Sequence, residues 1–293
     1  MGIDNIAVIV YIVFMSLNFT GQTALITGAS SGLGVEFARV LAARGANLVL
    51  VARRSDRLEA LAAELRTEFG RAVTPYSLDL TRSGVGAELH QALAERNITI
   101  QTLINNAGFG THGSFVDEDS ARIANEIQLD VAAVVDLART FLPDLLAAGT
   151  GALVNVASTA GFQPLPGMAV YGASKAFVLS FTEAIAHETR ASGLKVIALC
   201  PGATETEFFD VVGTKDAAVG ALQTPEQVIA TAMRALDARR TPAVVISGRV
   251  NMISSTLVRL VPRRVAVALA ARAVAGSAHP EPAAGDISAR VGA

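Results

Sequence analysis

Short apolar runs rich in β-branched residues alternate with longer helical patterns along most of this chain, and this alternation restricts the fold more than any other feature. A helix between two such runs returns the chain across a sheet, so consecutive strands are parallel and both faces of the sheet are covered. We therefore predict one doubly wound α/β domain with about seven parallel strands. The predicted strands are Thr23–Thr27, Asn47–Ala52, Ala72–Ser77, Thr102–Asn105, Ala152–Ser158, Lys195–Cys200 and Ala243–Ser247, and the predicted helices are Leu33–Arg44, Ser55–Phe69, Gly84–Arg96, Asp119–Ala147, Ala169–Ala191 and Pro225–Arg239.

Composition is that of a globular protein. Of the 293 residues 51% are hydrophobic, 17% are charged, and the formal net charge is -2. The charges are spread along the chain without the basic cluster that a nucleic-acid partner would require. Cys200, the single cysteine, lies in the apolar run KVIALC, which predicts a buried strand residue and no intrachain disulfide. We therefore expect a reducing, cytoplasmic location.

The N-terminal segment falls outside the alternating pattern. Ile6–Leu17 is almost wholly apolar, but it is shorter than the ~20 residues that a membrane-spanning helix needs. Asp4 and the absence of Lys or Arg before Arg39 disfavour a signal peptide. The first-ranked interpretation is that the true start is Met15, and the second is a peripheral contact with a membrane or a partner.

The C-terminal region is expected to form one amphipathic helix over Met252–Val274, interrupted by Pro262 and carrying several arginines. Packing against the domain is the default expectation, and the alternatives are that the region completes the pocket, joins a subunit interface or touches a membrane. The end of the chain is rich in Ala, Gly and Pro and is expected to be disordered. The predicted boundaries are an N-terminal extension at 1–19, the α/β domain at 20–250, the C-terminal helix at 251–275 and the tail at 276–293.

Several element boundaries are marked by the residues that favour them. Gly45 and Gly70 fit helix C-caps, while Thr224, Pro225 and Gln227 fit an N-cap, a first-turn proline and a capping box. The preceding connection, from residue 207 to residue 223, is longer than a simple crossover needs. We interpret it as a substrate lid.

The run TGASSGLG, from Thr27 to Gly34, directly follows the first strand and opens the first helix. Gly28 allows a tight turn, Gly32 lets a phosphate approach the backbone, and Gly34 permits close packing of the helix. The helix N-terminus presents unpaired N–H groups to an anion. This context predicts a Rossmann-type dinucleotide site rather than a P-loop, because the GK[ST] ending is absent.

The end of the second strand, in VLVARR, indicates which dinucleotide is preferred. Ala52 stands where an NAD-binding chain would carry an acidic residue for the ribose diol, and Arg53 follows it. An arginine there can pair with a 2′-phosphate, so NADP(H) is favoured over NAD(H), with Arg54 as a possible helper. The alternative for both arginines is a pair of solvated turn residues.

Tyr171 and Lys175 stand four residues apart in YGASK, with Ser158 thirteen residues before the tyrosine. On a helix, positions i and i+4 share a face, which places the ammonium close to the phenol. A fixed cation should lower the pKa of a phenol from its usual ~10 and suit it to proton transfer. The trio therefore predicts acid/base chemistry on an alcohol or a carbonyl.

Four separated motifs together resemble the short-chain dehydrogenase/reductase family over roughly Thr20 to Ser247. They are TGASSGLG, NNAG at Asn105–Gly108, Ser158 with YGASK, and PG at Pro201–Gly202. The resemblance implies that Tyr171 is the general acid or base, that Ser158 binds the reacting oxygen, and that Lys175 holds the nicotinamide ribose. It also implies an adenine-side contact at Asp79, a nicotinamide contact at Thr204 or Thr206, and a cofactor site made of Thr27, Gly28, Ser30, Ser31, Gly32, Leu33, Gly34, Arg53, Asp79, Leu80, Asn106, Ala107, Gly108, Tyr171, Lys175, Pro201, Gly202, Thr204 and Thr206.

One position departs from the family pattern. Many members carry an asparagine in the helix before the fifth strand, where it supports a water-linked proton path to the lysine, and the matching residue here is Asp130. An ionised aspartate only accepts hydrogen bonds and would add negative charge near Lys175. We therefore include Asp130 among the candidate catalytic residues.

The leading interpretation is an NADP(H)-dependent oxidoreductase acting on a carbonyl or alcohol of a small apolar molecule. Apolar side chains expected near the nicotinamide are Phe162, Leu165, Met168, Phe208 and Phe209, with Ser158 and Tyr171 also contacting substrate. The rivals are a cofactor-binding regulatory or scaffold protein with weak turnover, and a membrane-associated lipid or sterol reductase. No pair of histidines has the spacing of metal ligands. The family resemblance suggests a homo-oligomer built on the helices containing Asp130 and Tyr171.

Overall fold

The computed structural model describes residues 17–213 and 222–277 of the chain, so the apolar N-terminal run, part of the expected lid and most of the expected disordered tail lie outside the described residues. Seven strands form one parallel sheet, as predicted, and their order is β3-β2-β1-β4-β5-β6-β7. They are β1 (Thr23–Thr27), β2 (Asn47–Ala52), β3 (Val73–Ser77), β4 (Thr102–Asn105), β5 (Ala152–Val156), β6 (Lys195–Cys200) and β7 (Val244–Ile246).

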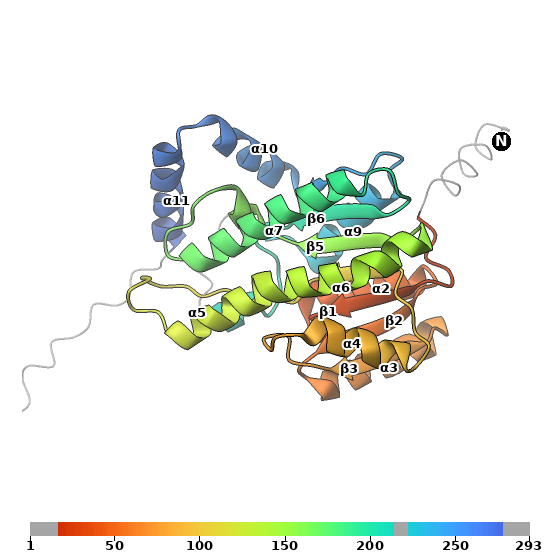
Figure 1. The fold of residues 1–293 in the computed structure, drawn as a ribbon. Helices are drawn as coiled ribbons and strands as arrows, with labels where there is room; N and C mark the ends of the chain where they lie inside the picture. Colours follow the sequence, from red (N-terminus) through yellow and green to blue (C-terminus); the bar gives the residue numbers. More distant parts are fainter. Residues whose placement is uncertain (1–16, 214–221, 278–293) are drawn as a thin grey trace, which may run out of the picture.

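Helices cover both faces of this sheet (Figure 1). The helices packed on one face are α2 (Gly32–Ala43), α3 (Ser55–Phe69) and α9 (Pro225–Asp237), and those packed on the other are α4 (Val85–Ala94), α6 (Ala133–Ala148) and α7 (Ala169–Glu188). The buried side chains form a hydrophobic cluster on each side of the strands. Central strands are therefore apolar on both faces, which is why they read as continuous apolar runs in the sequence.

The edge strand β3 contains a proline, a residue that only an edge strand tolerates in its middle. Pro75 lies in the middle of β3 and cannot donate a ladder hydrogen bond. Because β3 pairs only with β2 and closes that side of the sheet, the missing donor leaves no partner unsatisfied. Two predicted helix ends are confirmed: Gly70 is a left-handed C-cap with φ +63, and Thr224 and Gln227 form a capping box. The predicted C-cap Gly45 instead follows the cap residue Arg44, with φ +91.

The prediction of one uniform helix over Asp119–Ala147 is wrong in its middle. Asp119 caps α5 (Ser120–Ile127), and the chain then forms a π-helical segment, Gln128–Ala132, before continuing as α6. A π turn inserts extra backbone into a helix and commonly occurs at functional sites. Here the inserted segment contains Asp130.

The predicted C-terminal helix is also divided. The structure has α10 (Arg249–Leu257), a 3-10 turn (Val258–Leu260) and α11 (Arg263–Ser277), with Pro262 at the break. Figure 1 shows α10 and α11, in blue, at an outer corner of the molecule. Within residues 17–213 and 222–277, no helix has the length and hydropathy of a transmembrane span.

Candidate active site

A cavity of about 910 Å³ opens at the carboxyl ends of the strands. The strand order reverses between β1 and β4, and doubly wound sheets bind ligands in the crevice beside such a reversal. Three predicted site residues, Thr27, Gly34 and Asp130, lie behind the cavity wall instead of lining it. The other predicted residues all line it: Gly28, Ser30, Ser31, Gly32, Leu33, Arg53, Asp79, Leu80, Asn106, Ala107, Gly108, Ser158, Phe162, Leu165, Met168, Tyr171, Lys175, Pro201, Gly202, Thr204, Thr206, Phe208 and Phe209.

The glycine turn between β1 and α2 is held by close backbone packing. Gly28 and Gly32 have φ of +65 and +53, a region that residues with a Cβ rarely adopt. A Cβ on Gly28 would lie 2.9 Å from Ala107 Cα, and one on Gly34 would overlap the Gly28 carbonyl oxygen. The backbone at the start of α2 can therefore approach an anion closely, and these residues fit the phosphates of a dinucleotide.

The NNAG segment braces this turn from the neighbouring strand. Asn106 donates its side-chain amide to Thr27 O at 2.9 Å, while Thr27 Oγ1 accepts the Asn106 and Ala107 N–H groups at 2.9 and 3.0 Å. Asn105 instead points into the core, where its amide donates to Asn155 Oδ1 at 2.9 Å. Thr27 and Asn105 therefore support the site without lining the cavity.

Two arginines lie at the end of the cavity predicted to bind adenosine. Arg53 is exposed on the rim, and Arg54 donates to Ser30 Oγ and Ser31 Oγ at 3.0 and 2.9 Å. Arg54 also forms an ion pair with Glu207 at 2.8 Å, which ties the start of the expected lid to the glycine turn. Asp79 lies nearby and accepts the Thr81 N–H, which together with the Thr81 hydroxyl lowers its pKa.

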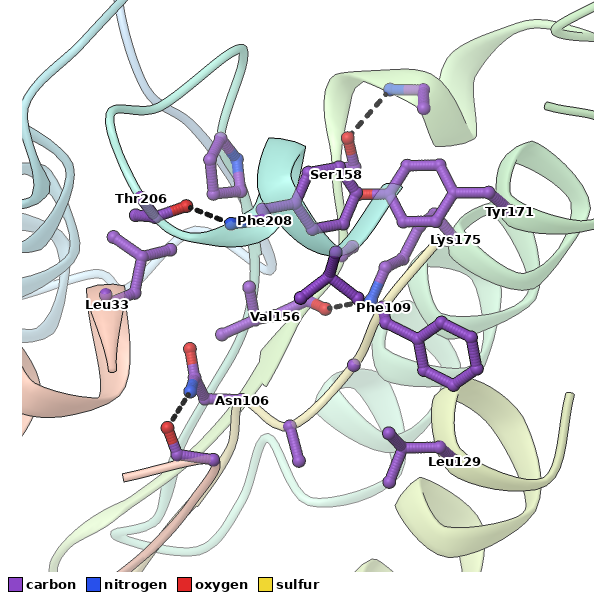
Figure 2. Close-up of a pocket in the computed structure, with 18 of the residues that line it drawn as sticks. Leu33, Asn106, Phe109, Leu129, Val156, Ser158, Tyr171, Lys175, Thr206 and Phe208 are labelled. Atoms are coloured by element: carbon purple, nitrogen blue, oxygen red, sulfur yellow. Dashed lines mark hydrogen bonds between the residues drawn. The ribbon is translucent and has the colours of Figure 1, made fainter. Parts of the chain in front are cut away.

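Ser158, Tyr171 and Lys175 come together in the wall of the same cavity. Ser158 follows β5 and caps a short 3-10 turn, whereas Tyr171 and Lys175 lie one turn apart on α7. Figure 2 shows the three side chains on one side of the pocket, with Leu33 and Asn106 on the other. Lys175 is 5% exposed, donates to Val156 O at 3.2 Å and lies 5.6 Å from the centre of the Tyr171 ring.

The predicted lowering of the tyrosine pKa is reversed in the structure. Burial of the phenol raises the pKa of Tyr171, and the lowering by Lys175 and by the Ser158 hydrogen bond does not offset it. Asp130 adds to the upward shift because its negative charge disfavours a phenolate nearby. The sequence prediction considered the lysine and the aspartate but not the burial of the phenol, which is the largest cause of the shift.

Asp130 forms the second half of a buried ion pair. Its side chain is fully buried, Oδ2 lies 2.9 Å from Lys175 Nζ, and Oδ1 accepts the Phe109 N–H at 3.0 Å. Burial raises the pKa of Asp130, against the effect of the adjacent Lys175. Burial lowers the pKa of Lys175, but Asp130 and Tyr171 raise it and the net shift is upward. The ammonium is thus held charged between a phenol and a carboxylate.

Glu126, which the sequence analysis did not single out, is a second buried carboxyl one turn before Asp130. Its Oε2 accepts the Thr111 N–H at 3.1 Å, and its Oε1 has no hydrogen-bond partner among the described residues. Burial raises the pKa of Glu126 to about 7, and Asp130 contributes to the shift. The sequence carries no clear signal for Glu126, because surface helices carry many charged residues and their burial depends on packing.

The substrate end of the cavity is mostly apolar, with Phe208 packed against Tyr171 at 5.3 Å between ring centres. Three small polar residues of α10, Asn251, Ser254 and Ser255, complete the wall. The sequence analysis allowed the C-terminal region to complete the pocket but named no residue there, because the sequence does not show that α10 turns these polar residues inward. Asn251 donates to Ser247 O at 2.8 Å, which fixes this side of α10 against β7.

A parallel sheet with a glycine turn, beside a buried Ser-Tyr-Lys group, defines a class of dinucleotide-dependent oxidoreductases. Comparison with known proteins gives the family. The family model for short chain dehydrogenases matches residues 22–217, and the chain belongs to this family. It is an oxidoreductase that acts on CH-OH and carbonyl groups.

Individual relatives agree with this placement. A sulfoacetaldehyde reductase from Chromohalobacter salexigens is 42% identical over 186 residues, covering 62% of this chain and 72% of that protein. A short-chain dehydrogenase from Sphingobium yanoikuyae, solved in complex with NADPH, is 37% identical with a TM-score of 0.72, covering 83% of this chain and 97% of the other. A bulky-bulky ketone specific alcohol dehydrogenase from Comamonas testosteroni is 34% identical with a TM-score of 0.68, and the match covers 82% of this chain and 93% of the other.

Proposed function

We propose that this protein is an NADP(H)-dependent oxidoreductase that interconverts a ketone or aldehyde and its alcohol on a small apolar molecule. The observation that carries the proposal is the position of Ser158, Tyr171 and Lys175 in the wall of the cavity that also holds the glycine turn. A cofactor bound there would supply or accept the hydride at the substrate carbon.

Residues of the protein would transfer the proton to or from the substrate oxygen. In reduction, the Tyr171 hydroxyl gives its proton to the carbonyl oxygen, which Ser158 holds by a hydrogen bond. The Lys175 ammonium stabilises the resulting phenolate, and Asp130 keeps that ammonium charged and in place. Oxidation runs through the same steps in reverse, with the phenolate accepting the alcohol proton.

The proposed preference for NADP(H) rests on the end of β2. Arg53 lies on the cavity rim, and Ala52 leaves no carboxylate at the position from which a ribose diol would be bound. The preference for an apolar substrate rests on Phe162, Leu165 and Phe208 in the wall. The ketone-specific Comamonas relative supports a bulky apolar substrate, whereas the sulfoacetaldehyde reductase shows that family members also accept a small charged one.

The test is turnover of NADPH, followed by its absorbance, across a panel of aliphatic, aromatic and steroidal ketones, with NADH measured alongside. We expect oxidation of NADPH with at least one bulky ketone and slower oxidation of NADH. Tyr171→Phe should abolish turnover while leaving NADPH binding largely intact, and Tyr76→Phe, on the edge strand β3, is the matched control. Retained turnover in Tyr171→Phe would exclude this proton donor, and tight NADPH binding without turnover in the wild type would favour a regulatory role.

A further inference from the structure

The segment formed by α10 and its following 3-10 turn exposes an apolar stripe. Val250, Ile253, Leu257 and Leu260 follow one another at spacings of three, four and three residues, which places them on one side of a helix. Their exposed fractions are 76%, 56%, 56% and 77%. Four large aliphatic side chains along one helical face form a continuous patch rather than scattered surface residues.

The inward side of the same helix carries the polar residues. Asn251, Ser254 and Ser255 line the cavity, as described above, and Ser255 is only 5% exposed. The helix is therefore inverted relative to an ordinary surface helix, whose apolar side faces the core. Water is an unfavourable environment for such a stripe, so a contact on this outer side would be favoured by the hydrophobic effect.

The next helix, α11, continues the outward apolar face. Val265 and Leu269, one turn apart, are 44% and 53% exposed, whereas Ala266 and Ala270 are buried against the domain. We call the exposed apolar side chains of α10, the 3-10 turn and α11, with the arginines among them, the α10–α11 face. Figure 1 shows these two helices together at an outer corner of the molecule, away from the helices that cover the sheet.

All the charged side chains of the α10–α11 segment are basic. From Gly248 to Ser277 the sequence has no Asp or Glu, although the whole chain has a net charge of -2. Four exposed arginines of this stretch belong to the face, namely Arg249, Arg263, Arg264 and Arg272, whereas Arg259 is exposed but lies 4.9 Å over the centre of the Phe162 ring in the cavity wall. An exposed helical face that combines aliphatic side chains with arginines and lacks acids has the composition of helices that lie in the membrane interface.

We propose that the α10–α11 face binds the surface of a lipid bilayer that carries anionic head groups. The aliphatic side chains would enter the boundary between head groups and acyl chains, and the arginines would pair with lipid phosphates. A second copy of this chain fits the face less well, since a two-fold contact would bring the same arginines of the two copies together. Charge complementarity therefore favours the lipid surface.

The position of the face has a consequence for the active site. Because α10 lines the cavity with its inner side, a bilayer bound to its outer side would lie close to the substrate end of the cavity. An apolar substrate dissolved in the bilayer would then reach Tyr171 over a short path. This consequence rests on the proposed function, whereas the membrane contact itself does not.

The experiment is co-sedimentation of the full-length protein with vesicles of phosphatidylcholine alone or with 30% phosphatidylglycerol. We expect binding to the anionic vesicles that weakens as salt is raised. Arg263→Gln/Arg264→Gln should lower the partition coefficient roughly thirty-fold, at ~1 kcal/mol for each arginine near the surface. Leu257→Ser/Leu260→Ser should lower it at least as much.

Matched controls come from the amino ends of the strands, whereas α10 follows the carboxyl end of β7. Arg239→Gln/Arg240→Gln changes an adjacent exposed arginine pair before β7, and Leu146→Ser changes an exposed leucine at the end of α6. Both should bind like the wild type. The proposal is overturned if the protein does not bind anionic vesicles, or if the α10–α11 variants bind them as well as the wild type does. It is also overturned if the wild type is a dimer that only Leu257→Ser/Leu260→Ser disrupts. Turnover with a water-soluble ketone should be unchanged in the α10–α11 variants and in the controls. A failure of the membrane proposal is therefore distinguishable from a failure of the proposed oxidoreductase activity.

Discussion

The ammonium of Lys175 lies between a phenol and a carboxylate, and this arrangement sets the proton chemistry at the residue scale. Asp130 keeps the lysine charged, but it also offsets part of the positive field that would favour a Tyr171 phenolate. The structure therefore contains a tyrosine whose pKa is raised by burial and by an acid it does not touch directly. Glu126, on α5, adds a further acidic group one turn before Asp130.

Replacing Asp130 should shift the pH dependence of alcohol oxidation to lower pH. Because Asp130 raises the pKa of both Tyr171 and Lys175, Asp130→Asn should lower both, so that phenolate is present at a lower pH. We expect the rate of proton-limited steps to rise on the acidic limb of the profile of kcat against pH. Asp144→Asn, which pairs with His90 of α4 and does not line the cavity, is the control, and an identical profile for Asp130→Asn and wild type would contradict this role.

The buried carboxyl of Glu126 should make stability depend on pH. Its pKa is raised from an ordinary 4.5 to about 7, so the folded state holds this proton more tightly than the unfolded state. The resulting contribution is present below pH 4.5 and is lost as pH rises through about 7, a change of roughly 3 kcal/mol.

Glu126→Gln should therefore reduce the loss of stability between pH 4.5 and pH 7, because an amide cannot ionise. Urea unfolding at pH 5 and at pH 8 measures the difference, with Glu59→Gln on an exposed side of α3 as the control. The same difference in free energy of unfolding for Glu126→Gln and the wild type would show that Glu126 does not titrate in this range.

At the scale of elements, the ends and irregular turns of helices position the site. The π segment Gln128–Ala132 brings Asp130 to Lys175, and the capping box at Thr224 starts α9 directly after the expected lid. The 3-10 turn capped by Ser158 presents its hydroxyl to Tyr171. Each of these features is a local departure from regular structure between or within long regular elements.

Removal of the α9 cap should destabilise the fold by a predictable amount. Thr224 accepts the Gln227 N–H, and Thr224→Ala leaves that donor without its side-chain acceptor. We expect a loss of about 1 kcal/mol in the free energy of unfolding. Thr67→Ala, in the interior of α3, is the matched control and should have no destabilising effect. Equal stability of Thr224→Ala and wild type would show that solvent replaces the cap.

For the whole molecule, the outer side of α7 and the π segment carries a second apolar surface. A shallow groove there is lined by Ile127, Val131, Val170 and Phe177, and Phe177 is 43% exposed. These are the helices on which the sequence analysis expects the homo-oligomer to be built. The oligomer stays a prediction, and this groove is where we expect the subunits to meet.

A charged residue in the groove should separate the subunits. Phe177→Asp would place a carboxylate in the apolar contact and should shift the molar mass measured by light scattering from oligomer to monomer. Phe115→Asp, at an exposed position in the loop before α5, is the control and should leave the mass unchanged. An unchanged oligomer in Phe177→Asp would place the interface elsewhere.

The sequence by itself determined the parallel, doubly wound fold class, the glycine turn and the Ser158, Tyr171 and Lys175 group, because these depend on local periodicity and on short motifs. Apolar runs specify buried parallel strands, and glycines specify backbone that no larger residue can adopt. The fold class and the family predicted from these features are confirmed.

Only the tertiary structure decided the environment of those residues. The sign of the Tyr171 pKa shift depends on burial and on Asp130, which stands forty-one residues earlier in the chain and reaches Lys175 through a π turn. The buried state of Glu126 and the outward apolar side of α10 depend on how helices pack. The hydrophobic pattern of the sequence predicts the period of a helix, but tertiary packing decides which side of that helix faces solvent.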